Sequence, residues 1–297
     1  MPRMPREPDN QRRRVLHINR IIPNILTLMA TAAGLTGMRF AIDERWEAAA
    51  AAIVAAAILD TLDGRVARLL KGASKFGAEL DSLSDFVCFG VAPAMILYLW
   101  AMPGTAKAGW VACMLFAMSM GLRLARFNVA LDDPNKPAWT KTFFTGVPAP
   151  AGAGLALLPM VLSFLIGDDI MRRPEVVGVF LIGTAALVVS TIPTYSFKTA
   201  RIRRTWMLMT MLGVAAFAAF VVSAPWATLA TILIGYAITI PISYRAYGKL
   251  MARELATNGP PPDPAPDPTP DPTSDPTPDP TPDPATTTTP EDEKPDG

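Results

Sequence analysis

The sequence predicts an all-α membrane protein, a polytopic helical bundle of about eight transmembrane helices. Of its 297 residues, 51% are hydrophobic and 18% are charged, and the charges lie mainly outside long apolar runs. This distribution is typical of a chain that crosses a bilayer several times. The two cysteines, Cys88 and Cys113, fall within apolar runs and are too few for a disulfide framework, which argues against a small secreted domain.

The predicted spans follow from the length that a helix needs to cross the hydrocarbon core, about 20 apolar residues. Eight runs approach or exceed this length. They cover residues 21–40, 46–69, 80–101, 107–129, 146–166, 176–194, 206–222 and 226–244. We expect residues 21–250 to form one transmembrane domain, preceded by a basic cytoplasmic segment at residues 1–20.

The loops between these runs alternate in charge. Basic side chains gather at residues 12–14, 65–75, 198–204 and 245–253, whereas the loops on the other side are neutral, balanced or acidic. Because positively charged loops stay in the cytoplasm, both termini are predicted to be cytoplasmic. We expect a multi-pass protein of the inner, cytoplasmic membrane, and no nucleic-acid partner.

The end of the chain has a different composition. Residues 258–297 hold 15 of the 30 prolines and ten of the 26 acidic side chains, but one of the 27 basic ones. Proline removes backbone donors and favours extended conformations, so such a segment cannot build a core. We expect a disordered tail rich in Pro, Asp and Thr that acts as a solvated spacer.

Histidine is nearly absent, which excludes several kinds of catalysis. The single histidine, His17, falls in the basic strip before the first predicted span and is expected to be interfacial. Histidine-ligated zinc sites and Ser-His-Asp triads therefore lack a required residue.

Four carboxylates interrupt the second and third predicted spans. Asp60 and Asp63 are three residues apart, and Asp81 and Asp85 are four apart, so each pair lies on one helix face. A short basic loop joins the two spans, and antiparallel neighbours would bring all four acids together near the cytoplasmic surface. Single aspartates at helix ends often act as caps, but four in two pairs would repel strongly without counter-charge. Oxygen ligands suit Mg²⁺ or Mn²⁺, and shared carboxylates can bridge two ions.

Residues beside the acids are suited to a phosphate ligand. Gly64 adjoins Asp63 and Gly77 precedes Asp81, so each allows close approach to a helix backbone. Arg68 offers a planar donor to phosphate oxygens, and Ser74 adds a hydroxyl or a backbone amide. Small residues in membrane helices also serve helix packing, so the glycines indicate a phosphate site only because they lie beside the acids.

The stretch "DTLDGRVARLLKGASKFGAELDSLSD", residues 60–85, resembles the signature of the CDP-alcohol phosphotransferase family. Every fixed position of D-x2-D-G-x2-A-R-x8-G-x3-D-x3-D is present. Four further stretches resemble the integral-membrane branch of this family that forms phosphatidylserine. They are "IPNILTLMATAAGL" at 22–35, "GLRLARFN" at 121–128, "FTGVPAPAGA" at 144–153 and "IPTYSFK" at 192–198.

The resemblance implies a metal-dependent transferase that acts on CDP-diacylglycerol and L-serine and releases CMP. It implies that Asp60, Asp63 and Asp81 hold two divalent ions, and that Asp85 lies near the second ion and accepts a proton. A carboxylate among other carboxylates is a stronger base than an isolated one, which suits that role.

The resemblance further implies that Gly64, Arg68 and Ser74 contact the diphosphate and nucleotide of CDP-diacylglycerol. It also implies a homodimer.

The acceptor alcohol is the least constrained part of this interpretation. Serine requires a cation for its carboxylate and an acceptor for its ammonium group. Of the polar residues at the cytoplasmic end of the fourth span, Arg123, Arg126 and Asn128, we select Arg126 and Asn128 for the serine site. A topological arginine and a helix-ending asparagine are the alternative reading.

Two other functions compete with this one. The same metal site could serve another acceptor, namely glycerol 3-phosphate, inositol phosphate or choline, although a phosphorylated acceptor would favour more than the two arginines found in "RLARFN". A cation transporter would also hold carboxylates in the membrane. Transport sites lie near the bilayer midplane between broken helices, whereas these acids are predicted at helix ends.

Overall fold

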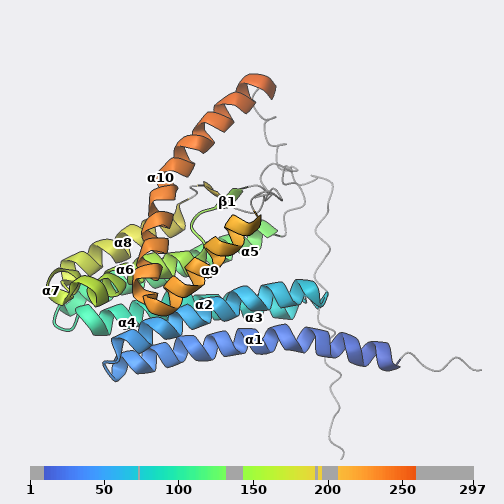
Figure 1. The fold of residues 1–297 in the computed structure, drawn as a ribbon, viewed down its shortest axis with the longest axis horizontal. Coiled ribbons are helices and arrows are strands. Elements are labelled where there is room, and N and C mark those ends of the chain that lie inside the picture. Colours follow the sequence, from blue (N-terminus) through green and yellow to red (C-terminus); the bar gives the residue numbers. More distant parts are fainter. Residues whose placement is uncertain (1–9, 73, 132–142, 191–192, 196–206, 259–297) are drawn as a thin grey trace, which may run out of the picture. The chain divides into compact units, whose positions relative to one another are not determined.

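The computed structural model describes residues 10–72, 74–131, 143–190, 193–195 and 207–258 (Figure 1). The chain divides into two units, Met1–Met251 and Ala252–Gly297. In the second unit, the described residues are the last turns of helix α10, which ends at Asn258. The predicted disordered tail from residue 259 onward lies outside the described residues, as do residues 1–9 of the predicted basic segment.

Helices α1 (Asn10–Ile42) and α2 (Trp46–Leu69) form a closely packed antiparallel pair (Figure 1). Small residues make the close approach possible. A Cβ atom on Gly37 would lie 3.2 Å from the carbonyl oxygen of Ala49, so the backbones nearly touch there. The pair therefore fixes the end of α2 relative to α1.

The third span is one helical rod with a change of pitch in its middle. It consists of α3 (Lys75–Asp85), the π-helix η1 (Phe86–Val91) and α4 (Ala92–Ala101). The π-helical turn begins directly after Asp85, and such turns are frequent at functional sites. A Cβ on Gly34 of α1 would lie 2.9 Å from the Cys88 sulfur, so η1 sits tightly against α1.

The remaining helices of the core are α5 (Ala106–Leu131), α6 (Ala149–Ile166), the short α7 (Asp168–Met171) and α8 (Pro174–Val189). α5 and α6 contact both α4 and η1, whereas α8 contacts α4, α5 and α6, and these helices surround a dense apolar core. Its largest fully buried side chains include Trp100, Phe89, Phe116, Met120, Met160 and Leu181.

Two short strands correct the purely helical prediction. β1 (Phe143–Thr145) pairs antiparallel with β2 (Pro193–Tyr195), with Phe144 opposite Thr194. The sixth predicted span, residues 176–194, therefore ends too late, because α8 stops at Val189. Pro193 lacks a backbone N–H and disfavours helix in the residue before it, whereas it is tolerated in an edge strand.

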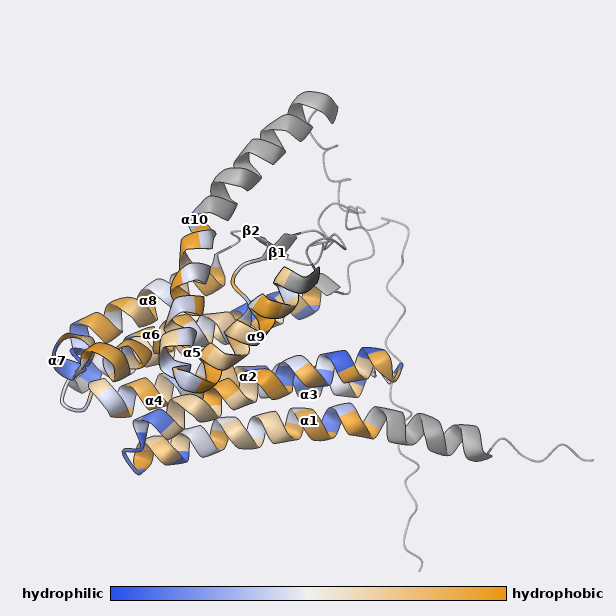
Figure 2. Ribbon diagram, in the orientation of Figure 1, coloured by the Kyte–Doolittle hydropathy of each residue, from blue (hydrophilic) through white to orange (hydrophobic). Residues whose placement is uncertain are grey.

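The structure supports a membrane protein but does not confirm eight spans. Among the residues that the structure describes, four helical segments are long and apolar enough to cross a bilayer: Ile21–Ile42, Lys75–Ala101, Lys107–Val129 and Ala149–Ile166. A fifth is possible if α9 (Met207–Ser223) and the first part of α10 (Pro225–Asn258), bent by 120°, count as one. Hydrophilic residues concentrate where α1 meets α2, where α2 meets α3 and at α7 (Figure 2).

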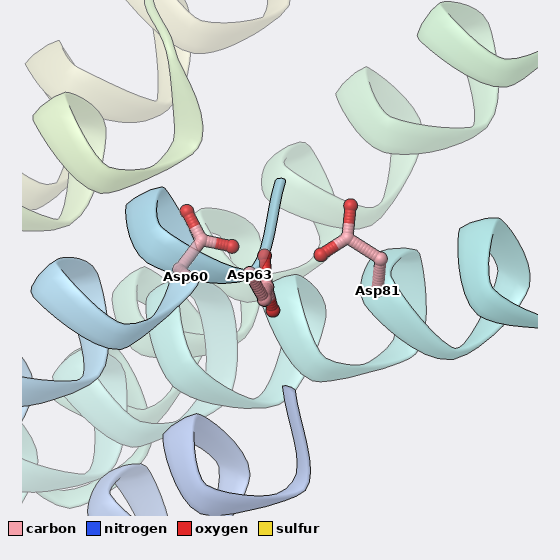
Figure 3. A group of neighbouring side chains, drawn as sticks. All are labelled: Asp60, Asp63 and Asp81. Carbon is pink, nitrogen blue, oxygen red and sulfur yellow. The ribbon is translucent and has the colours of Figure 1, made fainter. Parts of the chain in front are cut away.

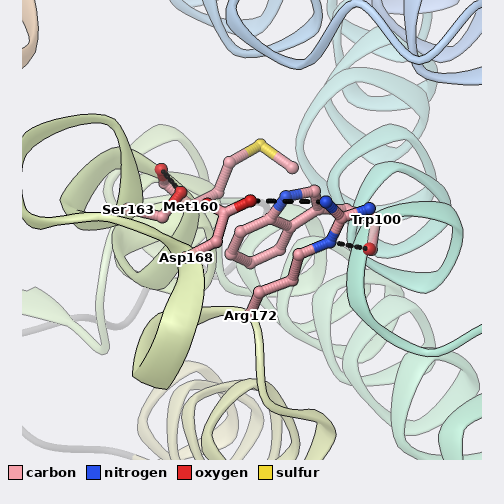
Figure 4. A network of polar contacts seen from close by, with 5 residues as sticks. All are labelled: Trp100, Met160, Ser163, Asp168 and Arg172. Carbon is pink, nitrogen blue, oxygen red and sulfur yellow. Dashed lines mark hydrogen bonds and ion pairs between the residues drawn. The ribbon is translucent and has the colours of Figure 1, made fainter.

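Arg172 connects α7 to the end of α4 (Figure 4). Its Nε donates a 2.9 Å hydrogen bond to the carbonyl oxygen of Trp100, one of the last helical carbonyls of α4, which have no partner within the helix. Its Nη1 lies 3.3 Å from Asp168, and its guanidinium stands over the Trp46 ring at 5.6 Å. One side chain thus ties α2, α4 and α7 together at the end of the bundle away from the acidic residues of α2.

We expect Arg172→Ala to lower the free energy of unfolding by about 1–2 kcal/mol, because a charge-assisted hydrogen bond to a helix end is lost. Thermal unfolding of the purified protein in detergent measures the change. Arg173→Ala is the matched control, since Arg173 is exposed and bonds only to the Asp169 carbonyl one turn before it. Equal melting temperatures for both variants would contradict this role of Arg172.

Candidate metal and substrate site

Three of the four predicted aspartates meet where α2 and α3 lie side by side. Asp60 and Asp63 are one turn apart near the end of α2, and Asp81 comes from the middle of α3. One carboxylate oxygen of each lies within 4.8 Å of the others. Figure 3 shows the Asp60 and Asp81 carboxylates turned toward each other with Asp63 between them.

The surroundings of these carboxylates fit a cation. Asp63 is buried, at 4% exposed, and Asp60 and Asp81 are partly buried. Oδ1 of Asp81 is buried and has no hydrogen-bond partner among the described residues. A buried carboxylate oxygen without a donor is costly, and two like charges nearby add to that cost. An arrangement of three converging carboxylates suits a hard divalent ion.

Asp85 lies beside this group rather than within it. Its carboxyl group is within hydrogen-bonding distance of Asp60, and its Oδ1 is buried without a hydrogen-bond partner in the described part of the chain. Arg123 of α5 is close enough for its charge to act on Asp85. The described geometry thus shows a cluster of three aspartates, with the fourth linked to it through Asp60.

Hydroxyl groups on α1 and α3 form hydrogen bonds with Asp63 and with one another beside the acidic cluster. Thr27 of α1 donates a 2.6 Å hydrogen bond to Oδ2 of Asp63. Ser84, which precedes Asp85, lies 2.8 Å from the Thr31 hydroxyl and donates to the Thr27 carbonyl at 3.3 Å. These residues were not identified from the sequence, because threonine and serine are ordinary in membrane helices and their partners lie 36 or more residues away.

The residues predicted to contact a diphosphate lie around the junction of α2 and α3. Gly64 follows Asp63, and a Cβ there would meet nothing within 4 Å among the described residues, so its surface is open. Arg68 is exposed, and its Nε donates to the Gly64 carbonyl at 3.0 Å. Ser74 caps α3, with its hydroxyl oxygen accepting from the N–H of Gly77 at 3.0 Å.

The residues selected for the serine site separate into two environments. Asn128 exchanges hydrogen bonds of 3.0 and 3.3 Å with Ser82, the neighbour of Asp81, so its amide lies near the acids. Arg126 instead donates through Nη2 to the carbonyl of Ser190 at the end of α8, at 3.3 Å.

Arg123 is not one of the two residues predicted for the serine site, yet its charge acts on Asp85. Its Nε is buried and makes no hydrogen bond within the described residues. The sequence offers no signal to rank the two arginines, since they are three residues apart on one helix.

An apolar cavity lies along α2, the helix that also carries Asp60 and Asp63. Its volume is about 380 Å³, and it lies between α2, α6 and α10. Its lining includes Thr61 and Leu62, which directly follow Asp60, together with Leu157 and Leu233. The acidic cluster and the apolar cavity thus both use residues of α2, a combination that suits an amphiphilic ligand.

Comparison with known proteins agrees with this geometry. The family model for CDP-alcohol phosphatidyltransferases matches residues 20–192, and a second model, CDP-alcohol phosphatidyltransferase 2, matches residues 205–241.

Several curated relatives carry the name CDP-diacylglycerol–serine O-phosphatidyltransferase. The protein from Mycobacterium leprae is 42% identical over 223 residues, which cover 75% of this chain and 74% of that protein. The protein from Mycobacterium tuberculosis strain H37Rv is 39% identical over 226 residues, 76% of this chain and 79% of that protein. The protein from Helicobacter pylori strain 26695 is 32% identical over 217 residues, 72% of this chain and 86% of that protein.

The first family model covers more than half of the chain, and its matched residues include all four aspartates and the helices that carry them. The resemblance found in the sequence is therefore confirmed: the chain belongs to the CDP-alcohol phosphatidyltransferase family.

Proposed function

We propose that this protein is an enzyme that transfers the phosphatidyl group of CDP-diacylglycerol to L-serine, giving phosphatidylserine and CMP. The observation that carries the proposal is the cluster of Asp60, Asp63 and Asp81, whose carboxylate oxygens lie within 4.8 Å of one another. The names of the relatives supply the choice of donor and acceptor.

In this proposal Asp60, Asp63 and Asp81 hold divalent cations, and Asp85 completes a four-aspartate site through its contact with Asp60. The expected cations are Mg²⁺ or Mn²⁺, two per site, because all the ligands are oxygen atoms. When bound, they would neutralise the diphosphate and the charge that develops on the departing CMP.

Asp85 is proposed as the proton acceptor. The serine hydroxyl oxygen attacks the phosphorus that carries the diacylglycerol, and its proton passes to the Asp85 carboxylate. The bond from that phosphorus to the bridging oxygen breaks, and CMP leaves with the electron pair. A carboxylate that stands among other carboxylates is a stronger base than an isolated one, which suits this step.

CDP-diacylglycerol is proposed to lie across the junction of α2 and α3. Arg68 and Ser74 flank this junction, and the open surface at Gly64 leaves room for the diphosphate. The apolar cavity between α2, α6 and α10 supports the same placement, since an acyl chain entering it would bring the phosphates toward Asp60.

The serine site is proposed at the inner end of α5. Asn128 supports this assignment best, because its bonds to Ser82 keep its amide near Asp81. Arg126 would meet the serine carboxylate after releasing the Ser190 carbonyl. Arg123 is the competing cation because its charge acts on Asp85.

The membrane arrangement is proposed from charge and from helix lengths. Eight spans, with both termini in the cytoplasm, would place the acids at the inner face of the cytoplasmic membrane. The described helices α1, α2, α3–α4, α5, α6, α8, α9 and α10 coincide with the eight predicted runs apart from shifted ends, which supports this count. We further propose the domain limits given above, a disordered tail and a homodimer.

Asp85→Asn should reduce turnover at least a hundredfold while leaving metal affinity within a few-fold of the parent, because it removes the base but not the three-carboxylate cluster. Asp63→Asn should lose both turnover and metal affinity, since it removes a carboxylate of the three-aspartate cluster. Turnover is followed by CMP release, and metal affinity by Mn²⁺ titration. Asp43→Asn, in the exposed turn between α1 and α2, is the control. Parental turnover in Asp85→Asn would remove the proposed base.

The acceptor is tested directly with purified protein and CDP-diacylglycerol. We expect CMP release and lipid product with L-serine, and at least tenfold less with glycerol 3-phosphate, inositol phosphate or choline, because Arg123 and Arg126, the two arginines of the "RLARFN" stretch, match one carboxylate better than a phosphate ester. Omitting the divalent metal should abolish the reaction. Product with another alcohol but not with serine would contradict the proposed substrate while keeping the metal site.

A further inference from the structure

Helix α1 carries none of the predicted site residues, yet one of its side chains reaches the acidic cluster. Thr27 is 4% exposed, as is Asp63, and they are two of only six polar or charged residues that are buried in the described part of the chain. A third member of that group is Ser84, which also contacts Thr27. Half of the buried polar residues described thus belong to the cluster or adjoin it.

The contact between Thr27 and Asp63 has the geometry of a strong hydrogen bond. The hydroxyl oxygen lies 2.6 Å from Oδ2 of Asp63, the separation typical of a hydroxyl that donates to a carboxylate. The same hydroxyl lies 3.1 Å from the carbonyl of Pro23. A hydroxyl has a single hydrogen, and the shorter contact with the charged acceptor takes it.

This bond acts together with the backbone N–H of Gly64 to restrict rotation of the Asp63 carboxylate. The terminal torsion of an aspartate is broad, so a carboxylate can turn about its axis at little cost. A donor on one oxygen stops that rotation and holds the carboxylate plane relative to Asp60 and Asp81. Because metal ligands depend on neighbours that orient them, loss of such a neighbour typically weakens metal binding 10- to 100-fold.

Thr27 is itself held in place. Its carbonyl oxygen is 3.0 Å from the Thr31 hydroxyl and 3.3 Å from that of Ser84. Ser84 in turn lies one residue before Asp85 on α3. The hydroxyl groups of α1 therefore link an acid of α2 to the segment of α3 that carries the other two acids.

We propose that Thr27 is a positioning residue for the metal-binding carboxylate of Asp63, and that its hydroxyl sets the affinity of the site for divalent ions. The inference rests on the proposed metal site, but not on the identity of the alcohol. Thr27 lies outside the 60–85 signature, so the signature alone does not define a working site.

The test is a Mn²⁺ titration, followed by electron paramagnetic resonance, of the purified full-length protein without CDP-diacylglycerol or serine. Thr27→Val keeps the shape of the side chain and removes the hydroxyl, and we expect about tenfold weaker Mn²⁺ binding. Thr27→Ser keeps the donor and should bind Mn²⁺ within about twofold of the parent. The melting temperature of each metal-free variant confirms that it is folded.

Thr184→Val is the matched control. Thr184 is also 4% exposed, but it lies in α8 and lines a separate apolar cavity. Its replacement should leave Mn²⁺ affinity unchanged, so a loss confined to Thr27→Val cannot come from general loosening of the bundle.

Two results would overturn the role of Thr27 alone. One is parental Mn²⁺ affinity in Thr27→Val. The other is a loss in Thr27→Ser as large as in Thr27→Val, which would assign the effect to packing at this position and not to the hydroxyl group. Failure of the parent protein to bind Mn²⁺ would instead overturn the metal site and, with it, both this inference and the proposed function.

Discussion

Mutual repulsion among carboxylates is the constraint on which the rest of this structure depends. Three acidic side chains place oxygens within 4.8 Å of one another, and a fourth lies against the first. In a largely apolar helical bundle such a group raises the free energy of the folded chain unless a cation is present. The site is therefore organised for an ion, and the surrounding packing must hold the acids together against their own charge.

That packing comes mainly from α1, a helix without a ligand of its own. Gly37 lets α2 approach on one side, and Gly34 lets η1 approach on another. Thr27 of α1 donates a hydrogen bond to Asp63 of α2, and Ser84 of α3 donates one to the carbonyl oxygen of Thr27. The close packing and the hydrogen bonds act in the same direction, since each keeps α2 and α3 at the separation that makes one acidic cluster.

The parts of the site that the sequence could predict are those governed by helical periodicity. Spacings of three and four residues place Asp60 with Asp63, and Asp81 with Asp85, on single helix faces, and the short loop brings the two helices together. The parts of the site that the sequence could not predict depend on contacts between helices. Nothing in the chain near Thr27 or Ser82 indicates a partner far along the sequence, and nothing near Arg126 predicts that it bonds to the Ser190 carbonyl.

Fold boundaries show the same division. Apolar runs predicted where the helices lie. The pairing of β1 with β2, beyond the early end of the sixth predicted helix, joins segments 50 residues apart, so no local sequence pattern indicates it. The π-helical turn after Asp85 is likewise set by tertiary packing, since Cys88, Phe89 and Gly90 are buried among neighbouring helices.

The most direct measurement is anomalous X-ray scattering from crystals of the full-length protein grown with Mn²⁺. The account predicts one or two anomalous peaks between α2 and α3, within about 2.5 Å of carboxylate oxygens of Asp60, Asp63 and Asp81. Crystals that diffract well and show these carboxylates ordered, but with no anomalous peak among them, would contradict the claim that repulsion between the acids is relieved by a bound metal.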